Sequence, residues 1–173
     1  MPFPFARAWA ALAYGGALTE ALLRWKHGKN RHLAPVLAGY FTPLVVAALE
    51  QGIDIACPVP LHPRRLRQRG FNQALDLVRA ARGRTRPKLH LDIACDALGR
   101  IVDTPSLGHA PPGRRRQLVA NAFRVARPGR VAGKRVLVVD DVMTTGATLA
   151  ECARVLLAAG AREVAVATLA RAV

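Results

Sequence analysis

The segment that most limits the fold is RVLVVDD, from Arg135 to Asp141, in which four consecutive apolar residues precede two acids. A continuous apolar run of this kind is typical of a central parallel strand that is covered on both faces. A short Thr/Gly loop follows, and the apolar residues of the next segment are in helical phase until Gly160 ends it. This strand–loop–helix unit predicts an α/β domain with a mostly parallel central sheet flanked by helices.

The rest of the chain extends this prediction. We expect two helices, Ala8–Trp25 and Leu33–Leu49, which form a small N-terminal helical appendage (residues 1–50) before a domain at residues 51–173. The remaining expected elements are a strand at Ile53–Leu61, an exposed basic loop at His62–Gly70, a helix at Phe71–Arg82, strands near Ala97–Val102 and at Ala122–Ala126, a loop at Thr104–Gln117, and a last strand at Glu163–Ala172.

The amino-acid composition limits the kinds of partner and the cellular compartment that we expect for this chain. The chain has 26 Lys and Arg against 11 Asp and Glu, a formal net charge of +15, which favours polyanionic partners; solvated arginine-rich faces are the alternative. Its three cysteines form no CxxC pair, so we expect a reducing, cytoplasmic location and no zinc site. The apolar run Leu33–Leu49 contains two prolines and a glycine, and we interpret it as a buried helix without membrane insertion.

The loop Thr144, Thr145, Gly146, Ala147 and Thr148 leads into a predicted helix. The first N–H groups of a helix lack intrahelical partners, and the helix dipole adds positive charge, so an anion is stabilised there. Gly146 allows a positive φ or a close approach of the backbone, and the threonine hydroxyls add donors. We predict a phosphate cup that differs from a Walker A loop, because no GxxxxGK[ST] motif is present.

Asp140 and Asp141 lie just before this cup, at the predicted strand end. Carboxylates accept hydrogen bonds from vicinal ribose hydroxyls and attract Mg²⁺ that is shared with a ligand. A ribose 5-phosphate therefore fits both halves of the motif. Adjacent acids after an apolar strand also occur in response regulators and Walker B strands, and an ordinary strand–turn–helix capped by threonine remains the structural alternative.

The segment VLVVDDVMTTGATL resembles the signature of type I phosphoribosyltransferases that binds 5-phosphoribosyl 1-pyrophosphate (PRPP). CPVPLHPRRLRQRGFNQA, from Cys57 to Ala74, is similar to the corresponding region of the competence protein F (ComF) family, which includes the GntX-like proteins. The resemblance extends over roughly Ala17 to Val173 and implies a type I phosphoribosyltransferase fold. The four-cysteine zinc module that often precedes this fold in the family has no counterpart among these cysteines.

The resemblance also implies roles for individual residues. The pyrophosphate of PRPP is expected on the loop with Pro58, Val59 and Pro60, aided by Arg64, Arg65 and Arg69, whose planar guanidinium groups suit phosphate oxygens. A solvated basic loop, or one that binds a nucleic-acid backbone, is the alternative. Asp140 and Asp141 are expected to orient the ribose and to hold Mg²⁺ directly or indirectly. For Lys26, a role in the site and a simple helix-end role both stay open.

Two functional hypotheses follow. The first is a PRPP- and Mg²⁺-dependent transferase of the glycosyltransferase class, in nucleoside metabolism, with an unidentified acceptor. The second is a non-catalytic accessory protein of DNA uptake that senses PRPP or binds single-stranded DNA. The aromatic content of only 5% weakens a base-stacking surface. The sequence does not indicate an oligomeric state.

Overall fold

The structure is a computed structural model that describes residues 3–26, 30–85, 90–104 and 112–172. In chain order the elements are β1 (Arg7–Ala13), α1 (Gly16–Lys26), α2 (Leu33–Glu50), β2 (Ile55–Pro58), α3 (Pro63–Arg69), α4 (Gln73–Arg82), β3 (Asp92–Ile93), β4 (Leu98–Arg100), α5 (Pro112–Val119), β5 (Phe123–Val125), the 3₁₀ turn η2 (Pro128–Arg130), β6 (Arg135–Met143), α6 (Ala147–Ala158) and β7 (Glu163–Arg171).

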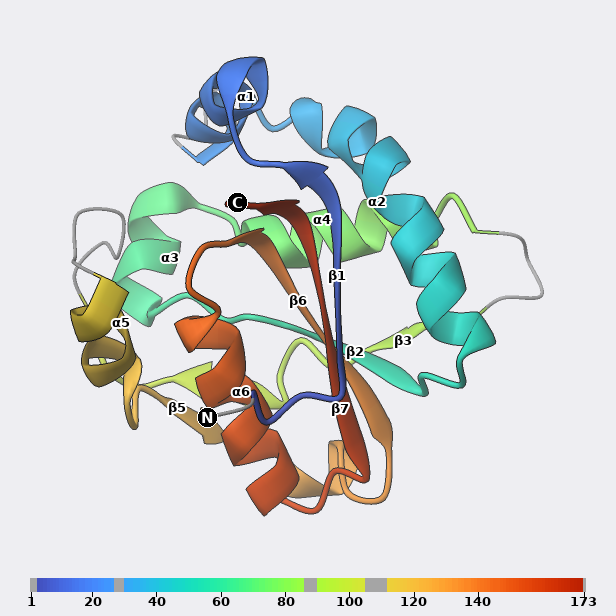
Figure 1. Cartoon of the computed structure of the whole chain (residues 1–173), viewed down its shortest axis with the longest axis vertical. Helices are drawn as coiled ribbons and strands as arrows, with labels where there is room; N and C mark the ends of the chain where they lie inside the picture. Colours follow the sequence, from blue (N-terminus) through green and yellow to red (C-terminus); the bar gives the residue numbers. More distant parts are fainter. Residues whose placement is uncertain (1–2, 27–29, 86–89, 105–111, 173) are drawn as a thin grey trace.

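A five-stranded parallel sheet forms the centre of the molecule, with the strand order β1-β7-β6-β2-β3 (Figure 1). Strand β6 lies in the middle, and its register places Val139 opposite Pro58 of β2 and Ala167 of β7. Strands β4 and β5 form a separate antiparallel pair. The predicted α/β fold with a mostly parallel central sheet is therefore confirmed.

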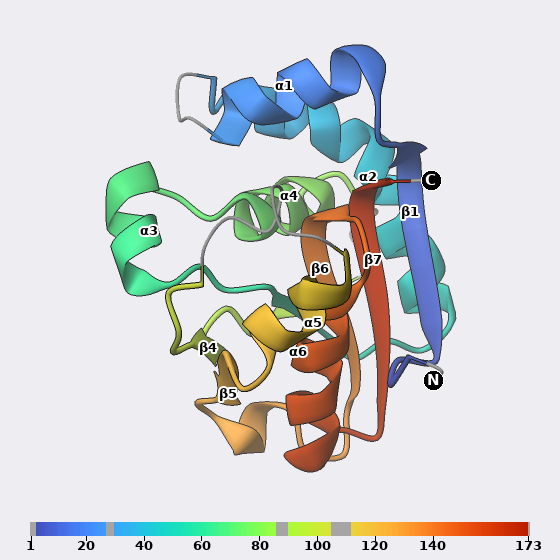
Figure 2. The ribbon, with the colours of Figure 1, turned by 60° about the vertical axis from the view of Figure 1, so that its left-hand side comes forward.

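Helices cover both faces of this sheet (Figure 2). Helices α1, α2 and α4 bury their apolar residues on one face, where Leu137 and Val139 of β6 belong to the same core. On the other face α6 packs with the β4–β5 pair against Val136 and Val138. Successive side chains of a strand point to opposite faces, so β6 supplies apolar residues to both cores. This explains its unbroken apolar run.

Local signals in the sequence account for the ends of two helices. The Asn72 side chain caps α4, because its Oδ1 accepts a hydrogen bond from the N–H of Leu75 at 3.3 Å. Its Nδ2 also donates to the carbonyl of Val59 at 2.9 Å, which ties α4 to the loop after β2. Helix α6 begins after Gly146 and is followed by Gly160, and both glycines have the positive φ that favours this residue.

The expectation of a helix at Ala8–Trp25 is wrong for its first half. Residues Arg7–Ala13 form β1, which pairs with β7 in parallel and adds an edge strand to the central sheet. The helix α1 starts only at Gly16, directly after Gly15. Alanine-rich segments favour helix intrinsically, but pairing with an available sheet edge outweighs that weak preference. Residues before position 50 thus contribute a strand as well as helices.

Two segments predicted as loops contain helices. Residues Pro63–Arg69 form α3, with His62 as N-cap, proline at the first helical position and Gly70 at φ 80° after the end. Residues Pro112–Val119, at the end of the expected loop Thr104–Gln117, form α5. Both helices are short and basic, so neither shows the apolar periodicity on which the prediction relied.

Helix α2 is the one described helix that is long and apolar enough to cross a membrane by length and composition. In the structure one side of it, which includes Leu37, Phe41 and Val45, is buried in the core beside α4 and the sheet. The expectation of a buried helix at Leu33–Leu49 is therefore confirmed for that side, while Val36 and Tyr40 on the outer side are exposed.

Candidate functional site

The carboxyl ends of the parallel strands bring the predicted site residues to one edge of the sheet. Val59, the first residue after β2, donates its N–H to the carbonyl of Val139 at 2.8 Å, so the loop leaves β2 directly beside the two acids of β6. The same edge carries the Thr/Gly loop after β6, and α1 lies above it (Figure 1). Ligands of open α/β sheets bind at such an edge.

The Thr/Gly loop adopts the predicted arrangement at the start of α6. Gly146 has φ 72° and precedes the first helical residue, Ala147. Thr144 is exposed, while Thr145 and Thr148 are partly buried. The free N–H groups of the first turn of α6 and these hydroxyls supply the donors that an anion needs. A Cβ on Gly146 would lie 3.0 Å from the ring of Phe3, which packs against the loop.

Asp141 forms an ion pair with Lys26, the last residue of α1, and the distance from Lys26 Nζ to Asp141 Oδ2 is 3.0 Å. The Asp141 side chain is 12% exposed and that of Lys26 is 32% exposed. Burial acts to lower the pKa of Lys26, but the charge and hydrogen bond of Asp141 outweigh it and raise this pKa above its ordinary value. The α1 segment therefore reaches the site.

Asp140 lies within β6 rather than at its end, because the strand continues to Met143. Its Oδ1 accepts the N–H of Asp141 at 2.9 Å. Burial and, next, the neighbouring Asp141 carboxylate raise the pKa of Asp140 to about 8. The charge of Asp140 acts in turn on Arg100 of β4, whose guanidinium lies 5.3 Å from the Phe123 ring centroid. Lys26 thus acts on both acids, and Arg100 is a further basic neighbour of Asp140.

Helix α3, which follows the loop after β2, brings its arginines to the same carboxyl edge of the sheet. Arg69 donates to Gln73 Oε1 at 2.8 Å, and burial lowers its pKa although the Asp141 charge opposes this. Arg65 Nε lies 3.3 Å from Asp103 Oδ1, and Arg64 is largely exposed. His62 caps α3, because its Nδ1 accepts the N–H of Arg64. Arg69 therefore lies near Asp141, and Arg65 lies near Arg69 and pairs with Asp103.

The structure brings together most of the residues that the sequence singled out. The acids, the Thr/Gly loop, the loop with Pro58, Val59 and Pro60, and the arginines of α3 share one edge of the sheet. For Lys26 the structure favours the role in the site, since its ammonium contacts Asp141. Arg100 was missed, because an arginine at the end of a three-residue strand carries no motif.

The donor set at this edge is consistent with a magnesium ion that is held mainly by a ligand. In the described part of the chain no group of three or more His, Cys, Asp or Glu side chains is placed to hold a metal. Mg²⁺ in proteins is commonly bound through one or two carboxylates together with substrate phosphates and water. Asp140 and Asp141 fit that pattern and would hold the ion together with phosphate oxygens.

The chain is similar to known proteins in sequence and, more weakly, in fold. The model of the phosphoribosyl transferase domain matches residues 103–172. The DNA utilization protein YhgH of Escherichia coli K12 is 32% identical over 169 residues, which cover 95% of this chain and 72% of that protein. Competence protein F of Haemophilus influenzae is 37% identical over 129 residues, 66% of this chain and 49% of that protein. A hypoxanthine phosphoribosyltransferase structure from Staphylococcus aureus has a TM-score of 0.43 at 16% identity, over 80% of this chain and 62% of that one.

The parallel sheet, the acids beside the Thr/Gly loop and the domain match define a protein of the type I phosphoribosyltransferase class. Within that class, the chain belongs to the ComF-like family, together with YhgH and competence protein F. The resemblance stated from the sequence motifs is therefore confirmed.

Proposed function

We propose that this chain binds PRPP with Mg²⁺ at the carboxyl edge of its sheet and transfers the phosphoribosyl group to an acceptor yet to be identified. The observation that carries the proposal is the meeting of three chemically distinct parts at this edge. A loop with free N–H groups suits the 5-phosphate, two carboxylates suit the ribose diol, and a basic helix suits the pyrophosphate.

Each group would have a separate task in the transfer. The Thr144–Thr148 loop would fix the 5-phosphate, so that the anomeric carbon is held in one position. Asp140 and Asp141 would orient the ribose and balance the positive charge that develops on an oxocarbenium-like sugar. Arg65 and Arg69 would stabilise the departing pyrophosphate. Bound Mg²⁺ would supply Lewis-acid neutralisation of the pyrophosphate charge.

The test is calorimetric titration of the chain with PRPP in the presence of Mg²⁺, followed by a panel of nucleobases with detection of released pyrophosphate. The chain with Asp140→Asn and Asp141→Asn should bind PRPP at least about tenfold more weakly, because charge-assisted hydrogen bonds are lost. Glu163→Gln, at the start of β7 on the opposite edge, is the control and should bind normally. PRPP affinity that is untouched by the double substitution contradicts the site.

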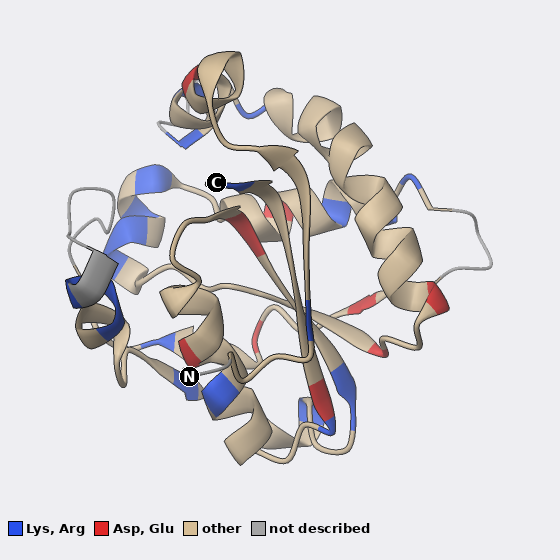
Figure 3. Cartoon of the chain, in the orientation of Figure 1, with Lys and Arg blue, Asp and Glu red and all other residues tan. Residues whose placement is uncertain are grey.

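A second candidate function, binding of single-stranded DNA, rests on the distribution of charge. Arginines gather on α3 and α5 (Figure 3). Basic surfaces of this kind contact the phosphate backbone without reading sequence. The relatives named as DNA utilization and competence proteins are compatible with a role in DNA uptake. One protein can use the acidic edge for PRPP and the basic surface for DNA.

A further inference from the structure

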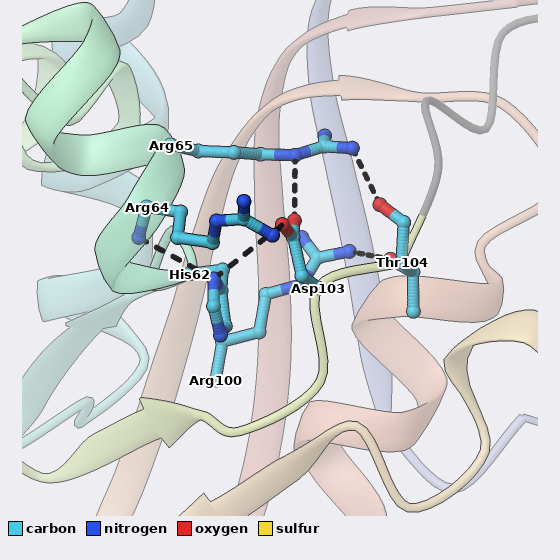
Figure 4. Close-up of polar contacts among 6 residues, drawn as sticks. All are labelled: His62, Arg64, Arg65, Arg100, Asp103 and Thr104. Carbon is cyan, nitrogen blue, oxygen red and sulfur yellow. Dashed lines mark hydrogen bonds and ion pairs between the residues drawn. The ribbon is translucent and has the colours of Figure 1, made fainter.

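Asp103, in the loop after β4, is the meeting point of the basic side chains at the start of α3 (Figure 4). Arg65 Nε lies 3.3 Å from Asp103 Oδ1. Arg64 Nη1 and His62 Nδ1 each lie 3.8 Å from Asp103 Oδ2. One carboxylate, whose side chain is 33% exposed, thus faces His62, Arg64 and Arg65, and the proposed function assigns Arg65 to the departing pyrophosphate.

The neighbouring Thr104 extends this contact. Its carbonyl accepts a hydrogen bond from Arg65, and its hydroxyl accepts one from Arg100. Thr104 is 3% exposed, so this end of the loop is packed firmly against the arginines. Asp103 is therefore held beside α3 by its own backbone neighbour, and its position does not depend on a weak surface ion pair alone.

We propose that Asp103 determines which anions Arg64 and Arg65 of α3 accept, by acting as an internal carboxylate that a ligand must displace. This inference rests on the proposed function, because it concerns the pyrophosphate side of the same site. A carboxylate carries one negative charge, whereas a pyrophosphate group carries several. Only a ligand with the higher charge and more acceptor oxygens gains more from the arginines than Asp103 does.

The selectivity follows from a competition between charges. A monoanion, such as a phosphodiester of a nucleic-acid backbone, offers the arginines no more charge than Asp103 already provides. Pyrophosphate and PRPP offer more, so they bind in spite of the loss of the internal contacts. Asp103 lowers the affinity of every anion that displaces it by the same factor, so anions of low charge, which the arginines bind more weakly from the outset, are the first to lose measurable binding. The retained charge also repels any anion that enters without displacing it.

The experiment measures the dissociation constants of pyrophosphate, inorganic phosphate and PRPP by calorimetry at one ionic strength. The variant is Asp103→Asn, which removes the charge and keeps the shape. The matched control is Glu163→Gln, because Glu163 also pairs with an arginine, Arg135, at 3.2 Å and with similar exposure, but at the amino ends of β6 and β7. Thermal melts verify that both variants remain folded.

We expect Asp103→Asn to bind pyrophosphate at least about threefold more tightly than the unchanged chain, with a similar factor of gain for inorganic phosphate. Glu163→Gln should bind both as the unchanged chain does. The gain in affinity from Asp103→Asn should be smaller in a chain that also carries Arg65→Ala. Arg65 makes the shortest contact with Asp103, and without it the carboxylate and the ligand no longer compete for that guanidinium. Unchanged or weaker pyrophosphate binding by Asp103→Asn overturns the inference and makes Asp103 a residue that orients Arg65.

The same titrations separate this inference from the proposed function. If the unchanged chain binds PRPP with Mg²⁺ but Asp103→Asn gains nothing, the inference on Asp103 fails and the proposed function stands. If the unchanged chain shows no PRPP binding while Asp103→Asn gains affinity for inorganic anions, the PRPP assignment fails and the competition at α3 is supported.

Discussion

At the scale of single residues, the ion pair between Lys26 and Asp141 ties the end of α1 to the centre of the sheet. Its two members differ in their access to water, because Asp141 is 12% exposed and Lys26 is 32% exposed. Loss of the lysine leaves a nearly buried carboxylate without its cation, whereas loss of the carboxylate leaves a lysine that can extend toward solvent. The two substitutions should therefore have unequal costs.

We predict that Lys26→Met lowers the free energy of unfolding by about 2 kcal/mol, and that Asp141→Asn lowers it by less. Urea denaturation measures both values. Arg24→Met is the control on the same helix, because it breaks only an exposed pair with Glu20 and should change stability by less than about 0.5 kcal/mol. A larger cost for Asp141→Asn than for Lys26→Met contradicts this account of the pair.

Glu151 on α6 links that helix to the turn before β5. Its Oε1 accepts the N–H of Asn121, a residue with φ 57°, at 2.8 Å, and Arg154 donates to both carboxylate oxygens. The hydrogen bond from Arg154 is the main cause that lowers the pKa of Glu151 in the folded chain. A lowered folded pKa contributes stability above the unfolded value near 4.5, and this stability is lost as pH falls through the folded value.

Glu151→Gln should therefore lower the free energy of unfolding at pH 7 by about 1–2 kcal/mol. The difference from the unchanged chain should shrink as the pH falls below 4.5 and through the lower pKa of Glu151 in the folded chain, because Glu151 then becomes protonated in both states. Urea denaturation at several pH values measures it. Glu20→Gln, which breaks an exposed pair, should show no comparable effect. A difference that stays constant between pH 7 and pH 3 rules out the linkage.

At the scale of elements, the turn between β6 and α6 combines two demands on Gly146. Its φ of 72° is unfavourable for any residue with a Cβ, and a Cβ there would meet the Phe3 ring at 3.0 Å. Gly133 has the same φ of 72° but has open space around it. The two glycines therefore separate the cost of backbone conformation from the cost of the contact with Phe3.

We predict that Gly133→Ala lowers the free energy of unfolding by about 1–2 kcal/mol, and that Gly146→Ala costs more. The extra cost of Gly146→Ala over Gly133→Ala should disappear when Gly146→Ala is made in a chain with Phe3→Ala, while the cost of the positive φ remains. Thermal or urea denaturation of Gly133→Ala, Gly146→Ala, Phe3→Ala and the double variant gives these differences. Equal costs at the two glycines show that the Phe3 ring moves aside freely.

The elements that could be predicted are those whose sequence carries a packing signal. The apolar run of β6 and the helical phase of α6 reflect two-sided and one-sided burial, and Asn72 marks the start of α4. Strand β1 could not be recognised, because its structure depends on the free edge of β7, which lies far away in the sequence. Helix α3 buries none of its residues, so only its proline and glycine ends identify it.

The same reasoning applies to the site. The acids and the Thr/Gly loop are contiguous in sequence, so their joint chemistry is readable without a structure. Lys26, Arg100 and Asp103 come from three other segments and meet the site only through the fold. Contacts of this kind depend on the placement of α1 and β4 around the sheet edge, and nothing in the local sequence encodes that placement.

At the scale of the whole molecule, the formal charge of +15 includes arginines clustered on two short helices and basic residues at the amino edge of the sheet. The carboxyl edge carries α3 and lies near α5, both rich in arginine (Figure 3). The amino edge carries Lys134 and Arg162 just before β6 and β7. If nucleic acid binds the basic surface of α3 and α5, only charges on that surface contribute to counterion release.

We predict the salt dependence of DNA binding for a variant at two exposed arginines, Arg67 on α3 and Arg114 on α5. Their joint replacement by alanine should weaken binding of a single-stranded oligonucleotide and flatten the plot of log K against log salt concentration by about 1.4, since each lost phosphate contact on a single strand removes about 0.7. Fluorescence anisotropy across a series of salt concentrations measures this slope. Lys134→Ala with Arg162→Ala removes the same charge from the amino edge and should leave the slope unchanged. Equal effects of the two pairs mean that DNA responds to net charge alone, and the α3 and α5 surface then has no special part in its binding.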